Sequence, residues 1–473
     1  MMSSVQTPDW VKSAIFYQIF PDRFANGDPG NDPPNVQPWG APPTLHSFQG
    51  GDLRGVIQHF DYLLDLGVNA LYLNPIFQAS SNHRYNTTDY YRIDPRLGDE
   101  ADLGALLDLA HRHGVRVILD GVFNHCGRGF FAFNDLLENE AHSPYRDWFH
   151  VRRFPLEAYG PGQAENYLAW WKFKSLPKFN TNNPEVRRFL LGVARHWIEQ
   201  GIDGWRLDVP NEIDDDSFWA EFRDQVKQAN PEAYLVGEIW DADPRWVGPG
   251  HFDGLINYPL RKSLLALIAE GALKPSEFAR QVECLFQVFP REHVHAHYLT
   301  LGSHDTERVR TLCGGDLRKV RLMSLFLFCF PGAPGIYYGD EIGLEGGKDP
   351  ESRRAFPWDE AAWDQELRAF IRQLVHLRRK MAVLRRGEYA PLLTDDRTGL
   401  FGFTRRKGRA EVAVVLNTSG ATHAAALPVG ELGWQDGEAV EDAIRGGMRR
   451  VTGGNVRLRL GPYEGALLHR QSA

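Results

Sequence analysis

Cysteine is scarce in this chain of 473 residues, and long apolar runs are absent. The four cysteines stand far apart without a CxxC pair, which excludes a disulfide framework and a zinc ribbon. The longest apolar run, near residues 322–330, ends at a Pro-Gly pair and is too short to span a bilayer. The first residues lack the basic and apolar regions of a signal peptide. We therefore expect a cytoplasmic protein.

Neither sign of charge dominates the sequence. The chain has 53 basic and 61 acidic residues, a formal net charge of −8, without a long run of either sign. This balance gives no reason to expect nucleic acid or an anionic membrane as a partner. Hydrophobic residues make up 43% and charged residues 24%, which excludes a collagen-like or largely disordered chain.

Short apolar runs that end in polar or charged residues recur along the chain. Helix-like stretches separate most of them, for example residues 100–114 and 185–201. Strands that alternate with helices are typical of a parallel sheet with crossover connections. The runs lie at residues 14–20, 70–75, 115–122, 204–209, 234–239, 254–258, 298–303 and 335–338. These runs predict a closed (β/α)₈ TIM barrel, in which functional residues gather at the carboxyl ends of the strands.

Two intervals depart from this alternation of predicted strands and helices. An irregular, aromatic-rich stretch follows the third strand and predicts a lid subdomain over the barrel mouth. Short alternating segments near the C-terminus predict an all-β sandwich, with strands at residues 399–404, 410–416, 451–458 and 465–469. The expected fold class is therefore α/β. The expected division is residues 1–122 and 183–385 for the catalytic barrel, 123–182 for the inserted subdomain and 386–473 for the sandwich.

Three carboxylates stand at the ends of three predicted barrel strands: Asp208, Glu238 and Asp305. Arg206 lies two residues before Asp208 and therefore on the same strand face, which in a barrel is the interior. A buried structural ion pair is one interpretation of Arg206 and Asp208 taken alone. The convergence of three carboxylates on one barrel mouth weakens that interpretation.

Hydrolysis of a glycosidic bond with retention of configuration needs such a set. A carboxylate nucleophile and a carboxylic acid must lie about 5–5.5 Å apart around the scissile bond. Neighbouring negative charge and apolar surroundings keep the acid protonated, whereas Arg206 beside Asp208 favours an ionised nucleophile. A third carboxylate can hold hydroxyl groups of a distorted sugar ring.

Six motifs in a fixed order are together highly specific. They are DGVFNH (residues 120–125), LPKFN (176–180), GWRLDVPNE (204–212), EIW (238–240), SHDTER (303–308) and GAPGIYYGDE (332–341). With these motifs the chain resembles the α-amylase family (glycoside hydrolase family 13), and the resemblance covers almost the whole chain from Trp10 onward. It implies Asp208 as the nucleophile, Glu238 as the general acid/base and Asp305 as the transition-state stabiliser.

The resemblance also implies side chains around the sugar at the cleavage point. Arg206, His125 and His304 match the residues that surround this sugar, and Tyr85 matches the aromatic residue that stacks on it. For a lone histidine or tyrosine, packing would be the simpler interpretation, but both histidines end strands at the same mouth. We expect Trp240 on the acceptor side, where a dry aromatic surface would favour sugar transfer over hydrolysis.

Within the family, the chain is similar to the neopullulanase, cyclomaltodextrinase and maltogenic amylase group, through VPNE (209–212) and LPKFN (176–180). The similar stretch GGKDPESRRAFPW (346–358) implies that Asp349 and Arg353 contact the next sugar on the non-reducing side; a surface salt bridge is the alternative. The group usually carries a large N-terminal β domain that helps to form a dimer. The predicted barrel begins almost at once here, so we expect a monomer or a non-standard dimer.

The group often binds calcium near the first barrel strand, and the resemblance implies a structural calcium ion. Closely spaced Asp and Asn oxygens with a backbone carbonyl suit a hard cation with roughly six to eight ligands. An ordinary Asx/Gly turn is the alternative, and the accompanying Gly-Gly-Asp segment favours calcium. The expected ligands are Asn26, Asp28, Asn31, Asp32, Gly50 and Asp52.

The resemblance therefore implies an intracellular, retaining α-glucan hydrolase. Its expected partners are oligosaccharides or polysaccharides with α-1,4 links, such as maltodextrins, cyclodextrins, pullulan or starch, and transglycosylation stays open. An exo-acting α-glucosidase or an α-glucanotransferase of the same family is the alternative. A catalytically silent binding subunit is disfavoured because the three carboxylates are present. Asn86 and Cys126 depart from the family's common residues, and only details of sugar binding are expected to change with them.

Overall fold

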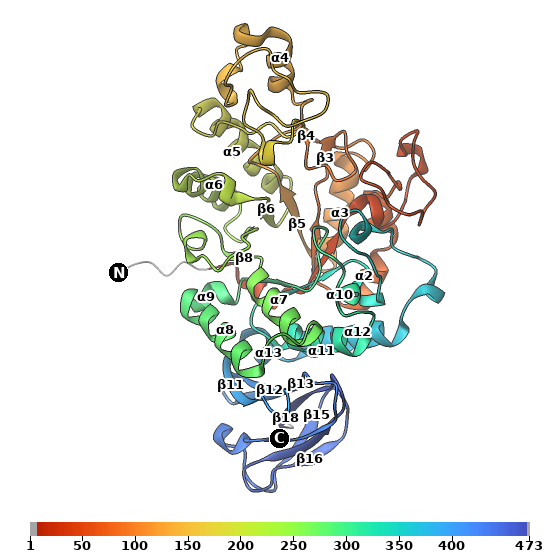
Figure 1. The fold of residues 1–473 in the computed structure, drawn as a ribbon, viewed down its shortest axis with the longest axis vertical. Coiled ribbons are helices and arrows are strands. Elements are labelled where there is room, and N and C mark those ends of the chain that lie inside the picture. The colour runs from red at the N-terminus through yellow and green to blue at the C-terminus, as the bar shows by residue number, and fades with distance from the viewer. Residues whose placement is uncertain (1–6, 471–473) are drawn as a thin grey trace.

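A barrel of parallel strands forms the centre of the computed structural model, which describes residues 7–470 (Figure 1). The sheet has eight strands in the order β8-β7-β6-β5-β2-β1-β10-β9. The strands are β1 (Phe16–Ile19), β2 (Ala70–Leu73), β5 (Arg116–Gly121), β6 (Gly204–Leu207), β7 (Tyr234–Gly237), β8 (Gly254–Leu255), β9 (Tyr298–Thr300) and β10 (Ala333–Tyr337). A parallel bridge between Ile256 and Tyr298 joins the two edges of the sheet. The predicted (β/α)₈ barrel is confirmed.

The barrel strands are almost continuously apolar because both of their faces are covered. Inside the barrel, Phe16, Tyr72, Val236 and Tyr298 belong to one buried apolar cluster. Alternate side chains on the same strands point outward into the main core beneath the helices. Gln18 is a buried polar exception in β1, and its side chain serves the site described below.

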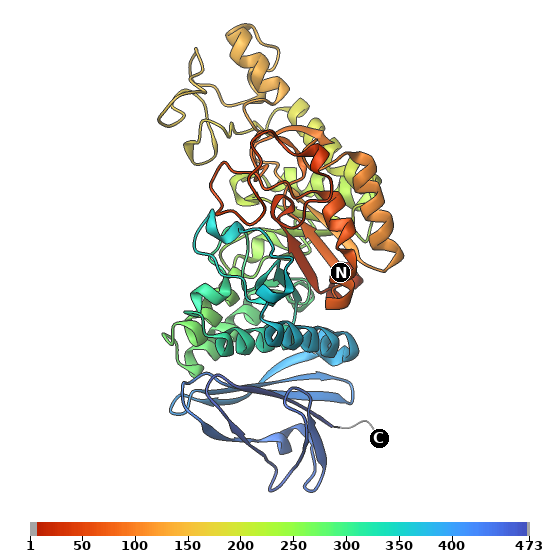
Figure 2. The same ribbon diagram turned by 90° about the vertical axis from the view of Figure 1, so that its right-hand side faces the viewer.

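Helices cover the outside of the barrel (Figures 1 and 2). Their starts follow local capping rules: Asn183 caps α5 (Pro184–Glu199), and Asp215 caps α6 (Asp216–Ala229). The others are α1 (Leu53–Gln58), α2 (Phe60–Leu66), α3 (Glu100–Arg112), α7 (Tyr258–Leu264), α8 (Pro275–Val288), α9 (Arg291–Val294), α10 (Val309–Leu312), α11 (Leu317–Cys329), α12 (Gln365–Lys380) and α13 (Ala382–Arg386). Among residues 7–470, none of the helices combines the length and apolar character that a membrane crossing requires.

Two further regions lie at opposite ends of the molecule (Figure 2). The stretch between β5 and α5 contains α4 (Phe131–Asn139) and projects at one end. At the other end, antiparallel strands form a sheet in the order β11-β12-β13-β18-β15-β16 and a separate pair, β14-β17. These strands are β11 (Glu388–Asp395), β12 (Leu400–Lys407), β13 (Ala410–Asn417), β14 (His423–Leu427), β15 (Ala439–Asp442), β16 (Met448–Arg450), β17 (Val456–Leu460) and β18 (Gly465–Arg470). Side chains of both sheets share one buried cluster, so the C-terminal region is the expected all-β sandwich.

The sequence analysis did not anticipate the hairpin of β3 (Phe77–Ala79) and β4 (Thr87–Ile93). Its two strands pair antiparallel with irregular register, and the connection between them contains Tyr85. The hairpin therefore places this tyrosine beside the barrel mouth.

Two buried arginines lie at the junction between the barrel helices and the C-terminal sheet. Arg378 of α12 donates to the carbonyl oxygens of Phe328, at 2.6 Å, and Phe330, at 3.0 Å. Arg405 of β12 donates to the carbonyls of Cys329, at 2.5 Å, and Gly387, at 2.8 Å. Burial lowers the pKa of Arg378 to about 9. The sandwich is therefore packed directly on the barrel, at the C-terminal end of α11.

Candidate active site

Asp208 and Glu238 lie at the carboxyl ends of the neighbouring strands β6 and β7. The backbone N–H of Asp208 donates to Gly121 and that of Glu238 to Leu207, so the strand ladder fixes both backbones. Arg206 reaches both side chains: Nη1 lies 2.9 Å from Asp208 Oδ1, and Nη2 lies 2.8 Å from Glu238 Oε1. One guanidinium therefore holds the two carboxylates together at the barrel mouth.

Asp120 on β5 is a third partner of Arg206 that sequence reasoning did not single out. Its Oδ1 lies 2.6 Å from Arg206 Nη1, and its Oδ2 accepts the hydroxyl groups of Tyr72 and Tyr85 at 2.7 Å each. Ile118 and Asp120 share the inward face of β5, so a carboxylate at this position was the available signal. Asp120 fixes the position of Arg206 and of the Tyr85 hydroxyl.

Burial and crowding of negative charge dominate the ionisation of the site. Burial raises the pKa of Asp208 well above its ordinary value, although Arg206 opposes the shift. Burial also raises the pKa of Glu238, again against Arg206, and the charge of Asp305 adds to the rise. Arg206 lowers the pKa of Asp208, as expected, but burial raises this pKa by more. The raised pKa values disfavour the state in which Asp208 and Glu238 are both ionised.

Asp305 behaves differently from the other two carboxylates. Its side chain is 34% exposed and lies 3.0 Å from His304 Nε2 and 3.2 Å from Arg353 Nη2. Burial raises its pKa, but His304 and Arg353 together outweigh burial and hold the pKa well below the ordinary value. Asp305 is therefore the carboxylate that stays ionised.

His304 is oriented by two amide side chains from neighbouring strands. Gln18 Nε2 and Asn74 Nδ2 each lie 3.1 Å from His304 Nδ1. An imidazole nitrogen that faces two donors acts as the acceptor, so the proton lies on Nε2, which is 2.5 Å from the Tyr85 hydroxyl oxygen and 3.0 Å from Asp305 Oδ2. The sequence analysis missed Gln18 and Asn74, and a buried polar residue within an apolar strand was the available signal.

His125 and Tyr85 lie around the same mouth. The Nδ1 of His125 lies 3.2 Å from the Asn124 amide, whereas its buried Nε2 has no hydrogen-bond partner. Burial lowers the pKa of His125 to about 3, so the ring is neutral near pH 7. The Tyr85 ring lies parallel to His304, with 5.4 Å between ring centroids. His125 therefore offers a polar nitrogen, and Tyr85 an aromatic ring, to a bound ligand.

Aromatic side chains extend away from these residues in two places. Trp240 stacks on Tyr258 with centroids 3.8 Å apart, and 50% of its surface is exposed. In the inserted region Trp170 stacks between His125 and Trp171, and Trp171 is 71% exposed. Such rings suit the apolar faces of sugars.

The structure also brings Asp349 and Arg353 to the site. Arg353 is buried, its Nε donates to the backbone carbonyl of His304 at 2.9 Å, and its Nη1 lies 3.3 Å from Asp349 Oδ1. The pair is therefore linked to Asp305 and is not an isolated surface salt bridge.

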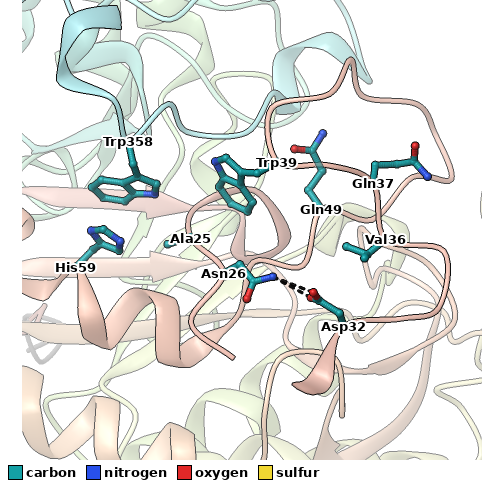
Figure 3. Close-up of a pocket in the computed structure, with 9 residues that line it drawn as sticks. All are labelled: Ala25, Asn26, Asp32, Val36, Gln37, Trp39, Gln49, His59 and Trp358. Carbon is teal, nitrogen blue, oxygen red and sulfur yellow. Dashed lines mark hydrogen bonds between the residues drawn. The ribbon is translucent and has the colours of Figure 1, made fainter. Parts of the chain in front are cut away.

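The six candidate calcium ligands form one cluster after β1. Asn26 Nδ2 donates to both oxygens of Asp32 (Figure 3), at 2.9 and 3.1 Å, while Oδ1 of Asn26 and Oδ1 of Asn31 are buried without a partner. A Cβ at Gly50 would lie 2.1 Å from Asp32 Oδ1, so only glycine fits there. Two unpaired amide oxygens beside a carboxylate are a donor set that suits a hard cation.

Other contacts of this cluster are those of a capped turn. Asp52 accepts the backbone N–H groups of Gly27, Asp28 and Gly55 and the side-chain amide of Asn31. Asp28 Oδ2 contacts Arg54. Within residues 7–470, no group of three or more His, Cys, Asp or Glu side chains has an arrangement that would hold a metal ion. A cation here would therefore depend on amide and backbone oxygens as well as carboxylates.

Comparisons with known proteins agree with this geometry. The family model described as "Alpha amylase, catalytic domain" matches residues 18–380. The chain is 46% identical to a cyclomaltodextrinase of Geobacillus thermopakistaniensis (strain MAS1) over 90% of this chain and 72% of that protein. It is 43% identical to neopullulanase 2 of Thermoactinomyces vulgaris over 98% of this chain and 78% of that protein. Among solved structures, the chain is similar to cyclic α-maltosyl-(1→6)-maltose hydrolase from Arthrobacter globiformis in complex with cyclic α-maltosyl-(1→6)-maltose. The TM-score is 0.90 and the sequence identity is 40%, over 98% of this chain and 100% of that one.

Proposed function

The chain is a glycoside hydrolase that belongs to the α-amylase family, and we propose that it cleaves α-1,4-glucosidic bonds of α-glucans with retention of configuration. The observation that carries the proposal is the bridge of Arg206 between Asp208, at 2.9 Å, and Glu238, at 2.8 Å. It holds a nucleophile and a proton donor at one mouth, as double displacement requires. The substrates that we propose are maltodextrins, cyclodextrins, pullulan or starch.

Two half-reactions follow from this assignment. In the first, Asp208 attacks the anomeric carbon while Glu238 gives its proton to the glycosidic oxygen, the C–O bond breaks and the reducing-end sugar leaves. In the second, Glu238 takes a proton from water, the water oxygen bonds to the anomeric carbon and the bond to Asp208 breaks. Two inversions at the anomeric carbon give retention.

Bound substrate favours a protonated Glu238 beside an ionised Asp208. The glycosidic oxygen accepts a hydrogen bond, which favours a protonated Glu238, and positive charge that develops at the anomeric carbon favours an ionised Asp208. Asp305 stays ionised beside His304 and Arg353, so it can accept hydroxyl groups of a distorted sugar. We assign Arg206, His125, His304 and Tyr85 to the sugar at the cleavage point.

Further sugars extend on both sides of the cleavage point. We assign Asp349 and Arg353 to the next sugar on the non-reducing side and the exposed ring of Trp240 to the acceptor side. A sugar on Trp240 would compete with water for the covalent intermediate, so transglycosylation is part of the proposal. An exo-acting α-glucosidase or an α-glucanotransferase is the alternative within the family.

Timed chromatography of products tests the proposal, with β-cyclodextrin, pullulan and soluble starch in parallel. Opening of cyclodextrin to maltose, with panose from pullulan, is the expected result. We add cyclic α-maltosyl-(1→6)-maltose, because the hydrolase of that sugar is matched over 100% of its chain. Glucose alone would favour the exo-acting alternative, larger oligosaccharides the transferase, and no product from any substrate would contradict the proposal.

We also propose a structural calcium ion held by Asn26, Asp28, Asn31, Asp32, Asp52 and the carbonyl of Gly50. The unpaired amide oxygens of Asn26 and Asn31 support it. The ion would tie together the turn that follows β1 and would take no part in bond cleavage. Thermal unfolding after EDTA treatment, with calcium and then magnesium added back, tests it: calcium alone should restore a higher melting temperature. An identical melting temperature in all three conditions would contradict the site.

For location and assembly we propose the cytoplasm and a monomer or a non-standard dimer. All four cysteines are free, and Cys126, Cys313 and Cys329 are buried, as suits a reducing compartment. Cell fractionation and analytical ultracentrifugation test the two parts separately.

A further inference from the structure

Trp171 of the inserted region is the most exposed large apolar side chain in the described part of the chain, with 71% of its surface exposed. Its backbone is left-handed, with φ 45° and ψ 28°, and the next residue, Lys172, has φ 61°. Residues other than glycine avoid this conformation because the Cβ atom crowds the backbone. The conformation is therefore held in place by the surrounding structure and not by burial of the ring.

A short antiparallel loop, residues 169–177, holds this conformation beside the catalytic mouth. The two ends of the loop form an antiparallel bridge, and the next bridge joins His125 to Lys178. Within the loop the carbonyl of Lys172 accepts the backbone N–H of Ala164 at 2.9 Å. The position of Trp171 relative to His125 is therefore fixed by backbone hydrogen bonds.

Three aromatic rings form a stack that leads from the catalytic mouth to Trp171. The ring centroids of His125 and Trp170 are 5.5 Å apart with planes inclined by 21°, and those of Trp170 and Trp171 are 4.8 Å apart with planes inclined by 11°. His125 is the side chain assigned above to the sugar at the cleavage point. One face of Trp171 lies on Trp170, so the stack ends in a free indole face.

This free face and Trp240 lie on opposite sides of the nucleophile. In the barrel sheet β6, which leads to Asp208, lies between β5 and β7. The inserted region follows β5, whereas Trp240 follows β7 and is 50% exposed. A curved chain of sugars that passes over Asp208 can therefore contact both indoles.

We propose that Trp171 is a specificity residue, whose free face binds one sugar of a cyclic α-glucan while another sugar of the same molecule occupies the cleavage point. The apolar C–H face of a pyranose matches an indole face. A trisaccharide already fills the three positions assigned to the cleavage point, to Asp349 with Arg353, and to Trp240. Trp171 is therefore available only to larger substrates. The choice of α-glucan rests on the proposed function.

Ring closure is the reason why a cyclic substrate should gain most from Trp171. In a cyclic glucan the sugars beyond the cleavage point are held near the mouth by the covalent ring. A linear chain must be ordered on binding before it can contact the same indole, and this ordering costs conformational entropy. The contact therefore adds more affinity for a cyclic than for a linear glucan of equal length.

A protein partner is the other occupant that an exposed tryptophan could have. A specific protein interface buries roughly 1,000 Å² or more, which one indole face cannot supply. Lys172, the next residue, is exposed and charged. The ring stack also continues into the catalytic mouth, and these observations favour a sugar.

The first test measures binding to the inactive Glu238→Gln variant by isothermal titration calorimetry, with β-cyclodextrin, maltoheptaose and maltotriose. Adding Trp171→Ala should weaken binding of β-cyclodextrin roughly tenfold or more and binding of maltoheptaose about two- to threefold, with maltotriose within twofold. Trp171→Phe, which keeps a flat ring, should retain most of the affinity. The matched control is Tyr159→Ala, which removes an exposed ring of the same inserted region that contacts Arg128. Equal losses for the three ligands, or no loss for any, would overturn the proposal.

The second test separates binding from a structural role. Trp171→Gly removes the ring and relieves the left-handed strain, so the melting temperature should stay the same or rise. In the active enzyme the same variant should lower kcat/KM for β-cyclodextrin roughly tenfold and for maltotriose less than twofold. A lower melting temperature together with equal losses on both substrates would show that the ring only supports the loop.

These measurements also distinguish this proposal from the proposed function. If the wild-type protein cleaves no α-glucan, the proposed function fails, and binding of β-cyclodextrin to Glu238→Gln still decides the role of Trp171. Analytical ultracentrifugation of Trp171→Ala tests the protein contact. A changed oligomeric state with unchanged cyclodextrin affinity would assign the ring to that contact and contradict the sugar site.

Discussion

At the barrel mouth Arg206 is buried among the carboxylates of Asp120, Asp208 and Glu238, whereas at the junction with the sandwich Arg378 and Arg405 are buried among backbone carbonyls. In the described part of the chain neither junction arginine forms an ion pair. The carbonyls of Phe328, Cys329 and Phe330 lie at or just after the end of α11, where helix carbonyls lack internal partners and carry partial negative charge, and the carbonyl of Gly387 follows α13.

The two arrangements serve different ends. At the junction both arginines donate to backbone carbonyls, which do not titrate, although burial lowers the pKa values of Arg378 and Arg405. The mouth crowds carboxylates so that their pKa values are raised, which disfavours their ionised forms and prepares them to exchange protons. Substitutions at the mouth should therefore abolish activity, and substitutions at the junction should reduce stability.

The largest effect is expected from Asp208→Asn. It removes the proposed nucleophile, and kcat on maltotriose should fall roughly 10⁴-fold or more. The melting temperature should stay the same or rise, because the raised pKa of Asp208 shows that its charge is disfavoured in the folded protein. Initial rates and thermal unfolding check both parts. Retained activity would contradict the mechanism, and a large drop in melting temperature would contradict the contrast with the junction.

Glu238→Gln should have the next largest effect. Loss of the proton donor should lower kcat on maltotriose roughly 10³-fold, because the leaving sugar can no longer be protonated. An aryl maltoside with an acidic phenol needs little protonation, so its cleavage should fall far less in the first half-reaction. Burst kinetics with the aryl substrate measure this step. Equal losses on both substrates would argue against a role as acid.

The junction is tested by Arg378→Met. It leaves the carbonyls of Phe328 and Phe330 without a donor, and the free energy of unfolding should fall by about 3 kcal/mol. Activity of the folded enzyme should stay within twofold. Urea unfolding with parallel rate measurements checks this, and Lys380→Met, at an exposed position of the same helix, is the control. A loss of kcat without a loss of stability would break the comparison.

The smallest effect on the pH profile is expected from Arg353→Gln. Arg353 helps to hold the pKa of Asp305 low, so its removal raises that pKa, but from well below the ordinary value. Asp208 and Glu238 have the raised pKa values, so activity is lost as pH falls through theirs, and the acid limb of kcat/KM should stay in place within about half a pH unit. Arg354→Gln, whose guanidinium faces Glu351 instead, is the control in the same pH series. An acid limb that moves up in Arg353→Gln alone would show that Asp305 sets it and would contradict the assignment to Asp208 and Glu238.

The barrel strands could be predicted from the sequence because buried parallel strands are continuous apolar runs that end in polar residues. The β3–β4 hairpin could not, because the residues of β4 follow no regular alternation of buried and exposed positions. A predicted strand at residues 451–458 appears as β17 (Val456–Leu460), since Gly453 and Gly454 adopt positive φ angles and form a turn.

The active site, too, could be predicted only in part from the sequence. Asp208, Glu238 and Asp305 could be predicted to meet because all three follow barrel strands. The contacts of Asp120, Gln18 and Asn74 depend on which strands are neighbours and on side-chain orientation, and strand order is not visible in one sequence. Glu238 and Asp305 were predicted as one set, but only the structure shows that they lie on opposite sides of the bridge between Ile256 and Tyr298.

In mechanical terms the barrel resembles a ring that is split between β8 and β9 and is closed there by that bridge. Inner strands such as β6 and β7 are paired over four positions. In the described residues β8 has only two residues, and the closure between β8 and β9 depends on the bridge between Ile256 and Tyr298. Asp208 and Glu238 follow the firmly paired strands β6 and β7, and Asp305 follows β9, on the other side of this split. A small widening of the ring therefore changes the space available to the sugar at Asp305 while the distance between nucleophile and acid stays fixed.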